Sequence, residues 1–306
     1  MYAAFLPLAL ILAAGLCYKF IPGVLPAADV RRAIGSIVLN IFLPALTFFA
    51  LYSTPLTSSL WTVPLTSTVV TLVGLGVAYL VYAVLLRRKL LRPAIGALLL
   101  ASAWCNATYL GLPVVTSVIG MHVQQVPILF DLLAMTPLLF IAGTIIGVEY
   151  GSGNERHSLS EALKQLLRLP PMWAAAAGIL LNAMHVALPV EVTTAFETAG
   201  RTVSPLMIFS VGLALRAPNI KRMPYILPSV VIRLGLGTLV GWFVASRLID
   251  DPDVFKTTVL ESAMPAMMLT MVFAERYGLD AELLAETIIL STIGAMITLP
   301  LIAHFL

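Results

Sequence analysis

Long apolar runs separated by short polar connections cover almost the whole chain. A run of about 20 apolar residues is long enough to cross the hydrocarbon core of a bilayer as a helix. Ten such spans fit the pattern. They are predicted at residues 2–21, 34–53, 63–86, 93–119, 124–148, 170–187, 199–216, 224–246, 254–276 and 283–304. The pattern therefore predicts an all-α polytopic membrane protein.

Two of these spans contain helix-breaking residues where the hydrocarbon would be deepest. In span 93–119 the run Asn106-Ala-Thr108-Tyr109-Leu-Gly111-Leu-Pro113 interrupts the apolar helix, and in span 254–276 the interruption is Met264-Pro265-Ala266. Lipid cannot satisfy the backbone groups that such a break releases, so each break must contact protein or a water-filled cavity. We therefore expect both breaks to belong to a functional site.

The breaks recur at matching positions in the two halves of the chain. The longest connection, residues 149–169, separates five spans from five, and each break lies in the fourth span of its half. The second span of each half carries Pro-x-x-x-Phe, starting at Pro44 and at Pro205. Because five is odd, the second half must be inverted relative to the first. This order predicts two inverted repeats, residues 1–153 and 154–306, with a transport site where the breaks meet.

The placement of charge predicts an orientation for these spans. The chain is 60% hydrophobic and 11% charged, and its formal charge of +3 is too small to indicate a nucleic-acid partner. Fourteen Lys and Arg residues lie in the connections after odd-numbered spans, and three lie in the others. The positive-inside rule therefore places the first set in the cytoplasm and both termini on the non-cytoplasmic side of the plasma (inner) membrane. The first set is Lys19, Arg31, Arg32, Arg87, Arg88, Lys89, Arg92, Arg156, Lys164, Arg168, Arg216, Lys221, Arg222 and Arg276, and the second is Arg201, Arg247 and Lys256.

Two short features complete the chain. The second half of the long connection, from Ser158 to Arg168, has a capping serine and the amphipathic pattern of a short helix at the membrane surface. Cys17 and Cys105 both lie in apolar runs, so a disulfide framework or a metal site is not expected. No cofactor is predicted.

The motifs at the special positions resemble those of the auxin efflux carrier family, which includes the plant PIN-type carriers and many bacterial relatives. The resemblance covers nearly the whole chain. The motifs are Asn40-Ile-Phe-Leu-Pro44, Asn106-Ala-Thr-Tyr-Leu-Gly111-Leu-Pro113 followed by Gly120, Pro205-Leu-Met-Ile-Phe-Ser-Val-Gly212, Ala263-Met-Pro265, Ala274-Glu-Arg-Tyr277-Gly278 and Leu299-Pro300.

The resemblance implies a ten-helix inverted repeat in which broken helices four and nine cross. Helices one, two, six and seven would form a scaffold, and the other helices would form a core that moves in an elevator-like way. The resemblance also implies a homodimer joined through the scaffold helices, and a small organic anion, such as a carboxylate or an auxin-like acid, as substrate.

The chemistry of the breaks agrees with an anionic substrate. Half-helices that meet at mid-membrane direct unpaired N–H groups and positive dipole ends into a cavity. The Asn106 amide can orient a carboxylate or a carbonyl, and Thr108 and Tyr109 each offer a hydroxyl. The alternative is that Asn106 only satisfies backbone groups released by the break. The predicted substrate-binding residues are Asn106, Thr108, Tyr109, Gly111, Pro113, Pro265, Ala266 and, on the facing scaffold helices, Asn40 and Ser204.

Asp131, Arg233 and Glu261 are ionisable residues well inside predicted spans. A charge near the bilayer centre costs about 2.5–3.5 kcal/mol, so each must face the interior, pair or be neutralised. One interpretation is a proton-binding carboxylate, Asp131 or Glu261, that couples transport to protons. The other is a structural ion pair between Arg233 and either acid.

The sequence thus predicts a secondary transporter that moves a small organic anion by alternating access, with efflux as the expected direction. One alternative keeps the architecture but makes it a sodium- or proton-coupled carrier of the bile-acid or cation–proton type. A receptor or a membrane-embedded enzyme is a further alternative. It is disfavoured because Gly-x-Gly-Asp, His-Glu-x-x-His and Gly-x-Ser-x-Gly motifs are absent from the sequence.

Overall fold

The structure, a computed structural model, describes residues 2–54, 57–152, 159–215 and 219–306. These residues form helices and connections, with one isolated β-bridge and no strand among them. Five continuous helical segments are long and apolar enough to cross a membrane: Ala27–Ser53, Ser59–Leu85, Met121–Tyr150, Ile220–Leu248 and Ala281–Phe305. The prediction of an all-α polytopic membrane protein is therefore confirmed, while the ten-span inverted repeat stays a prediction.

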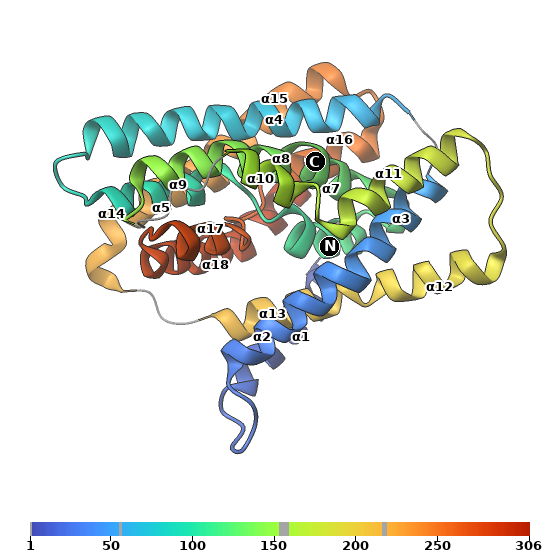
Figure 1. The fold of residues 1–306 in the computed structure, drawn as a ribbon, viewed down its shortest axis with the longest axis horizontal. Helices are drawn as coiled ribbons and strands as arrows, with labels where there is room; N and C mark the ends of the chain where they lie inside the picture. The colour runs from blue at the N-terminus through green and yellow to red at the C-terminus, as the bar shows by residue number, and fades with distance from the viewer. Residues whose placement is uncertain (1, 55–56, 153–158, 216–218) are drawn as a thin grey trace.

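The helices are labelled in chain order (Figure 1). Before residue 153 they are α1 (Tyr2–Tyr18), α2 (Ala27–Ile37), η1 (Val38–Phe42), α3 (Leu43–Ser53), α4 (Ser59–Ala78), η2 (Tyr79–Leu85), α5 (Arg92–Ala103), η3 (Ala107–Gly111), α6 (Leu112–Val118), η4 (Met121–Val123), α7 (Gln125–Phe130), η5 (Asp131–Met135), α8 (Thr136–Leu138), η6 (Leu139–Gly143) and α9 (Thr144–Tyr150). After residue 158 they are α10 (Leu159–Leu166), α11 (Pro170–Ala183), α12 (Val190–Arg201), α13 (Val203–Ala214), η7 (Ile220–Arg222), α14 (Met223–Val231), η8 (Ile232–Leu236), α15 (Gly237–Leu248), α16 (Pro252–Ser262), α17 (Thr270–Tyr277) and α18 (Ala281–Phe305).

The helices pack into two groups, which lie on different sides of the molecule in Figure 1. In the first helix group, α3 packs against α11 and α12, and α13 packs against α1 and α2. In the second helix group, α4 packs against α5 and α15, α18 packs against α5 and α14, and α16 packs against α15. The groups meet where α1 and α13 contact η3 and α6, the helix that follows the first break.

Close backbone contact holds the first helix group together. A side chain added at Gly15 of α1 would overlap the Phe209 carbonyl of α13, and one added at Gly212 of α13 would overlap the Leu12 carbonyl of α1. Small residues at such positions let membrane helices approach closely, so that van der Waals contact replaces the hydrophobic drive that lipid removes.

Wide π-helical turns accompany several of the special residues. The segments η1, η3 and η5 contain Asn40, Thr108 and Asp131 respectively, and η8 contains Arg233. Pro44 and Pro113 follow the first two segments and lack the N–H that would bond four residues back, which accounts for the widened turn there. Such turns are frequent at functional sites. The apolar periodicity of the sequence does not reveal them.

The helix boundaries correct the prediction in one region. Span 199–216 was predicted as one helix, but the structure has α12 and α13, which are separated at Thr202. The hydropathy pattern does not predict α12, because Glu191, Glu197 and several threonines interrupt its apolar residues. The helix predicted in the long connection corresponds to α10. Four other predictions lie outside the described residues: the cap Ser158, the repeat boundary at 153/154, Arg156 and Arg216.

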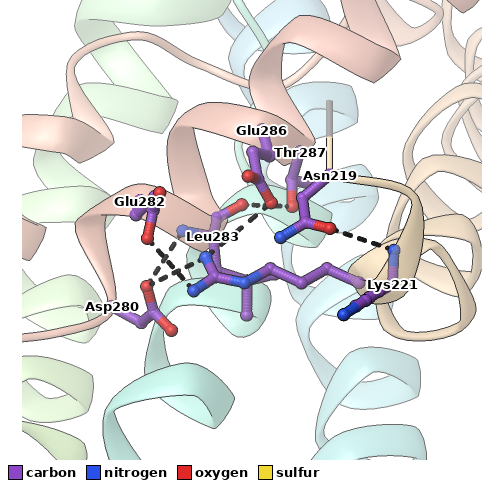
Figure 2. Close-up of polar contacts among 8 residues, drawn as sticks. Asn219, Lys221, Asp280, Glu282, Leu283, Glu286 and Thr287 are labelled. Atoms are coloured by element: carbon purple, nitrogen blue, oxygen red, sulfur yellow. Dashed lines mark hydrogen bonds and ion pairs between the residues drawn. The ribbon is translucent and has the colours of Figure 1, made fainter. Parts of the chain in front are cut away.

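An ionic cluster fixes the start of α18 to η7 (Figure 2). Arg222 contacts Glu282 at 3.1 Å, Glu286 at 3.7 Å and Asp280 at 3.8 Å. Asp280 also caps α18, because its carboxylate accepts a hydrogen bond from the Leu283 N–H at 2.9 Å. Of these acids Glu286 is buried, with 4% exposure, so the cluster compensates a buried carboxylate with a nearby guanidinium.

Candidate functional site at the paired helix breaks

The two helix breaks lie side by side and pair as a short antiparallel bridge. After α5 ends, the Asn106 N–H donates a hydrogen bond to the Pro265 carbonyl at 2.7 Å. The Met267 N–H donates to the Trp104 carbonyl at 2.9 Å, which sets Cys105 opposite Ala266. We call residues 104–106 and 263–269 the crossover. The pairing satisfies backbone groups that lipid would leave without partners.

Arg233 stabilises the crossover from the side of η8. Its guanidinium donates to the Ala103 carbonyl at 2.8 Å and to the Ser262 carbonyl at 2.7 Å. These carbonyls are at the C-terminal ends of α5 and α16, where the helix dipoles are negative. The side chain is 1% exposed. The fork of Arg233 thus caps both broken helices. Neither Asp131 nor Glu261 forms an ion pair with it.

Hydrogen bonds to three further segments hold the crossover and the end of α5 in place. Ser291 of α18 accepts a hydrogen bond from the Ala266 N–H at 3.1 Å. The Trp104 indole N–H donates to the Met135 carbonyl at 3.0 Å. The Ser102 hydroxyl donates to the Ser229 hydroxyl at 2.8 Å. Because the supports come from η5, α14 and α18, the second helix group carries the crossover as one packed unit.

A small cavity beside the crossover contains the Asn106 side chain. The cavity has a volume of about 50 Å³. Asn106 is 4% exposed, and its amide makes no hydrogen bond within the part of the chain that the structure describes. The lining residues are Leu39, Leu43, Asn106, Tyr109, Asp131, Leu132, Thr136, Phe140, Leu169, Pro171, Met267 and Leu269. A buried amide with unused donors and an unused acceptor is therefore available to a ligand.

The cavity lies between the two helix groups. Leu39 and Leu43 belong to the first helix group, as does Pro171 of α11. Asn106 comes from one segment of the crossover and Met267 from the other, and both segments belong to the second helix group. Any relative movement of the groups therefore changes the size of this cavity and its exposure.

Asp131 lines the same cavity with its carboxylate already hydrogen-bonded. One carboxylate oxygen accepts a hydrogen bond from the Thr108 hydroxyl, and the other accepts one from the Thr136 hydroxyl at 2.7 Å. A hydrogen-bond donor to each oxygen is the pattern expected of an ionised carboxylate, which can only accept. The Thr108 hydroxyl is thus engaged by Asp131, which leaves Asn106 and Tyr109 as the polar groups beside it.

Glu261, near the end of α16, is completely buried, with 0% exposure. Neither carboxylate oxygen has a hydrogen-bond partner among the described residues. The carboxyl group lies against Gly111 of η3, where any added side chain would overlap it. The glycine therefore leaves room for Glu261. This packing explains why a glycine is needed at position 111. The sequence predicts that Gly111 binds substrate, and the structure adds its contact with Glu261.

The other predicted site residues fall into two sets. Pro265 and Ala266 belong to the crossover through their backbone, and Pro113 is buried in the first turn of α6. Asn40 is exposed and its amide donates to the Ser36 carbonyl at 2.8 Å, and Ser204 is half-buried at the start of α13. Of the nine predicted substrate-binding residues, Asn106 and Tyr109 line the cavity at Asn106. The other seven do not line it: Thr108, Gly111, Pro113, Pro265, Ala266, Asn40 and Ser204.

The apolar walls of the cavity and the Ser291 contact carry no sequence signal of their own. Leu39, Phe140 and Leu169 look like ordinary membrane-helix residues, and only the packing of the helices brings them together. A heptad-like or small-residue pattern would not have selected them. The local sequence signals near the cavity are Pro44, which follows η1 in the first helix group, and Pro113, which follows η3 in the second.

Paired breaks buried among apolar helices, next to a polar cavity between two helix groups, define the class of membrane transport proteins. Residues 1–303 match the family model described as membrane transport protein. The chain belongs to this family, the auxin efflux carrier family, and is a multi-pass membrane transporter and not an enzyme.

Curated relatives agree with this assignment. An uncharacterized transporter of Methanothermobacter thermautotrophicus is 29% identical over 285 residues, which cover 91% of this chain and 90% of the relative. An uncharacterized transporter of Methanocaldococcus jannaschii is 27% identical over 70% of this chain and 69% of its own. A probable auxin efflux carrier component 5a of Oryza sativa is 26% identical over 46% of this chain and 40% of its own.

Proposed function

We propose that the protein is a secondary transporter that binds a small organic anion, such as a carboxylate or an auxin-like acid, at the crossover. The observation that carries the proposal is the unpartnered Asn106 amide in a buried cavity between the two helix groups. The helix that begins at Ala107, directly after the first break, adds N–H groups without intrahelical partners and a positive dipole end. The helix that begins at Thr270 after the second break adds a positive dipole end.

Alternating access follows from the position of the cavity. Its volume of about 50 Å³ is well below the ~150 Å³ of a cavity that holds benzene, so an auxin-like acid does not fit in this conformation. The first helix group would act as a scaffold, and the second group, with the crossover, would move against it to enlarge the site and expose Asn106 to each side in turn. The proposed ten-helix inverted repeat, with halves 1–153 and 154–306, supplies the two-fold related pathways that this movement needs.

Orientation and direction are part of the same proposal. The basic connections support an orientation with both termini on the non-cytoplasmic side, and a homodimer would form through the scaffold helices. With an inside-negative potential, each anionic charge exported gains about 2.3 kcal/mol per 100 mV. Efflux therefore needs no coupled ion, whereas import requires one.

A ligand screen on purified protein tests the site. We expect one or more acids from a panel of mono- and dicarboxylates to raise the thermal unfolding temperature of the wild type. Asn106→Ala should remove this shift while the unliganded unfolding temperature stays close to that of the wild type. Asn40→Ala, which changes an exposed amide outside the cavity, should retain the shift. An equal shift in Asn106→Ala would refute the assignment.

A further inference from the structure

We propose that Glu261 is a proton-binding site and that its proton is bound together with the organic anion at the crossover. The first half of this proposal stands on the geometry of Glu261, and the second half rests on the proposed function. The ligand class of the new site is a proton, with Glu261 as the group that takes it up from the side to which the site is open and releases it on the other.

The carboxyl group of Glu261 can take up a proton because no hydrogen-bond donor among the described residues contacts it. The side chain is 0% exposed, and both carboxyl oxygens lack hydrogen-bond partners among the described residues. The carboxyl group contacts Gly111, which is in the same helical segment as Thr108 and Tyr109. An ionised carboxylate at this place would be both desolvated and unpaired, which is far costlier than a neutral acid.

The charges around Glu261 are few and their partners are known. The Cys105 thiol donates a hydrogen bond to the Glu261 backbone carbonyl at 3.2 Å, so Cys105 contacts the main chain of Glu261 and not its carboxyl group. Arg233 is bound to two helix-end carbonyls, and Asp131 is bound to two threonine hydroxyls. Asp131 is close enough to interact with Glu261 electrostatically.

The other elements that pack against α16 add no charge at this position. Helices α4, α6 and α7 contain no titratable side chain. On η4, His122 pairs with Asp253 at 2.9 Å, at the far end of α16. On α18, Glu282 and Glu286 pair with Arg222, and His304 is near the C-terminus, while Arg247 is at the far end of α15.

The balance of charge links the proton to the anion. With Glu261 neutral, Asp131 and Arg233 cancel, and an anion meets helix N-termini and the Asn106 amide with no net opposing charge. With Glu261 ionised, the site holds two carboxylates against one guanidinium, and like charge opposes the anion. Proton and anion therefore favour each other's binding, by the same factor in both directions. Transport then moves one proton with each anion, so for a monovalent acid the membrane potential no longer favours efflux and the gradients of proton and acid set the direction.

Infrared spectroscopy tests the proton site without any substrate. At neutral pH the wild type should show the carbonyl stretching band of a protonated carboxylic acid, and the isosteric variant Glu261→Gln should lose it. Asp131→Asn should keep the band. Glu286→Gln, a matched control at a buried glutamate beside Arg222, should also keep it. Absence of the band from the wild type, or its survival in Glu261→Gln, would overturn the site.

Binding and transport measurements test the linkage. For the acid selected by the thermal screen, the dissociation constant of the wild type should rise about tenfold per pH unit above the pH at which Glu261 ionises. In Glu261→Gln the dissociation constant should be independent of pH over that range. An imposed pH gradient should drive uptake into proteoliposomes with the wild type and with Glu286→Gln, but not with Glu261→Gln. Unchanged gradient dependence in Glu261→Gln would refute the linkage, while the infrared result stands whether or not the substrate assignment holds.

Discussion

Arg233 solves a problem that a broken helix creates inside a membrane. Each break ends a helix and leaves carbonyl groups where no water is available. Two such ends, at Ala103 and Ser262, share one guanidinium, whose fork has donors in fixed directions. Room for the fork comes from Gly237, where any side chain would overlap Arg233. Arg233 thereby ties the ends of both broken helices, α5 and α16, to η8.

Replacing Arg233 should therefore destabilise the protein more than its single position suggests. Arg233→Met removes two charge-assisted hydrogen bonds at buried carbonyls, each with a net value of about 1.5–3 kcal/mol, so a loss of about 3 kcal/mol or more is expected. Arg233→Lys, which keeps the charge but not the fork, should have an intermediate effect. Thermal unfolding in detergent measures this. Wild-type stability in Arg233→Met would contradict the capping role.

At this scale the sequence identifies the buried polar residues but not all of their hydrogen-bond partners. Asn106, Asp131, Arg233 and Glu261 are recognisable because polar groups are costly within apolar spans. The acceptors of Arg233 are main-chain carbonyls, which every residue carries, so no sequence pattern could have distinguished them from an acid. The ion-pair interpretation considers only side chains. It therefore misses the bonds that the structure shows.

Helices of the two groups are held by different means. The second helix group is tied by polar contacts around the crossover, such as those of Ser291 and Trp104. In the first group α1 and α13 meet at glycines, and Gly200 of α12 packs on Leu46 of α3. An assembly held by close backbone contact is rigid, which suits the proposed scaffold.

Enlarging a glycine at this interface should separate α1 from α13. Gly15→Leu forces a side chain into the Phe209 carbonyl, and overpacking of this kind typically costs about 1–3 kcal/mol. Gly76→Leu is the matched control on α4, because nothing lies within 4 Å of the added atom there. A lower unfolding temperature is expected for Gly15→Leu alone. Equal effects of the two substitutions would show that the contact is not tight.

The existence of the helices is predictable from hydropathy, and their interruptions are predictable from Pro and Gly. What the apolar pattern cannot supply is local geometry within a continuous helix. The π-helical turns at Asp131 and Arg233 change which face of the helix each charge occupies, yet they leave the run of apolar residues unbroken. Helix α12 is missed for the opposite reason, since its polar residues hide a helix that packs on α3.

For the whole molecule, the boundary between the two helix groups is the proposed functional surface. The cavity at Asn106 is closed on one side by Leu39 and Leu43 and on the other by the crossover. Because the cavity is too small for an auxin-like acid in this conformation, the proposed mechanism requires the groups to move apart there when such a substrate enters. A bulky residue that fills the gap should therefore oppose transport without touching the polar groups.

Leu43→Trp provides this test. Leu43 is 3% exposed and lines the cavity, so an indole at this position would occupy the space beside Asn106. Strain of about 1–3 kcal/mol corresponds to a loss of rate of about 5- to 150-fold if it falls on the substrate-bound state. Leu72→Trp, at a 49% exposed position on α4, should transport at the wild-type rate. Similar rates for both variants would place the pathway elsewhere.

The central claim is that Asn106 binds the transported anion, and a counterflow assay in proteoliposomes tests it most directly. With the acid selected by the thermal screen, the wild type should exchange external radiolabelled acid for internal unlabelled acid in a saturable way. Asn106→Ala should fall to the level of protein-free liposomes while remaining folded, and Asn40→Ala should keep the wild-type rate. Saturable exchange by Asn106→Ala at the wild-type rate would contradict the account.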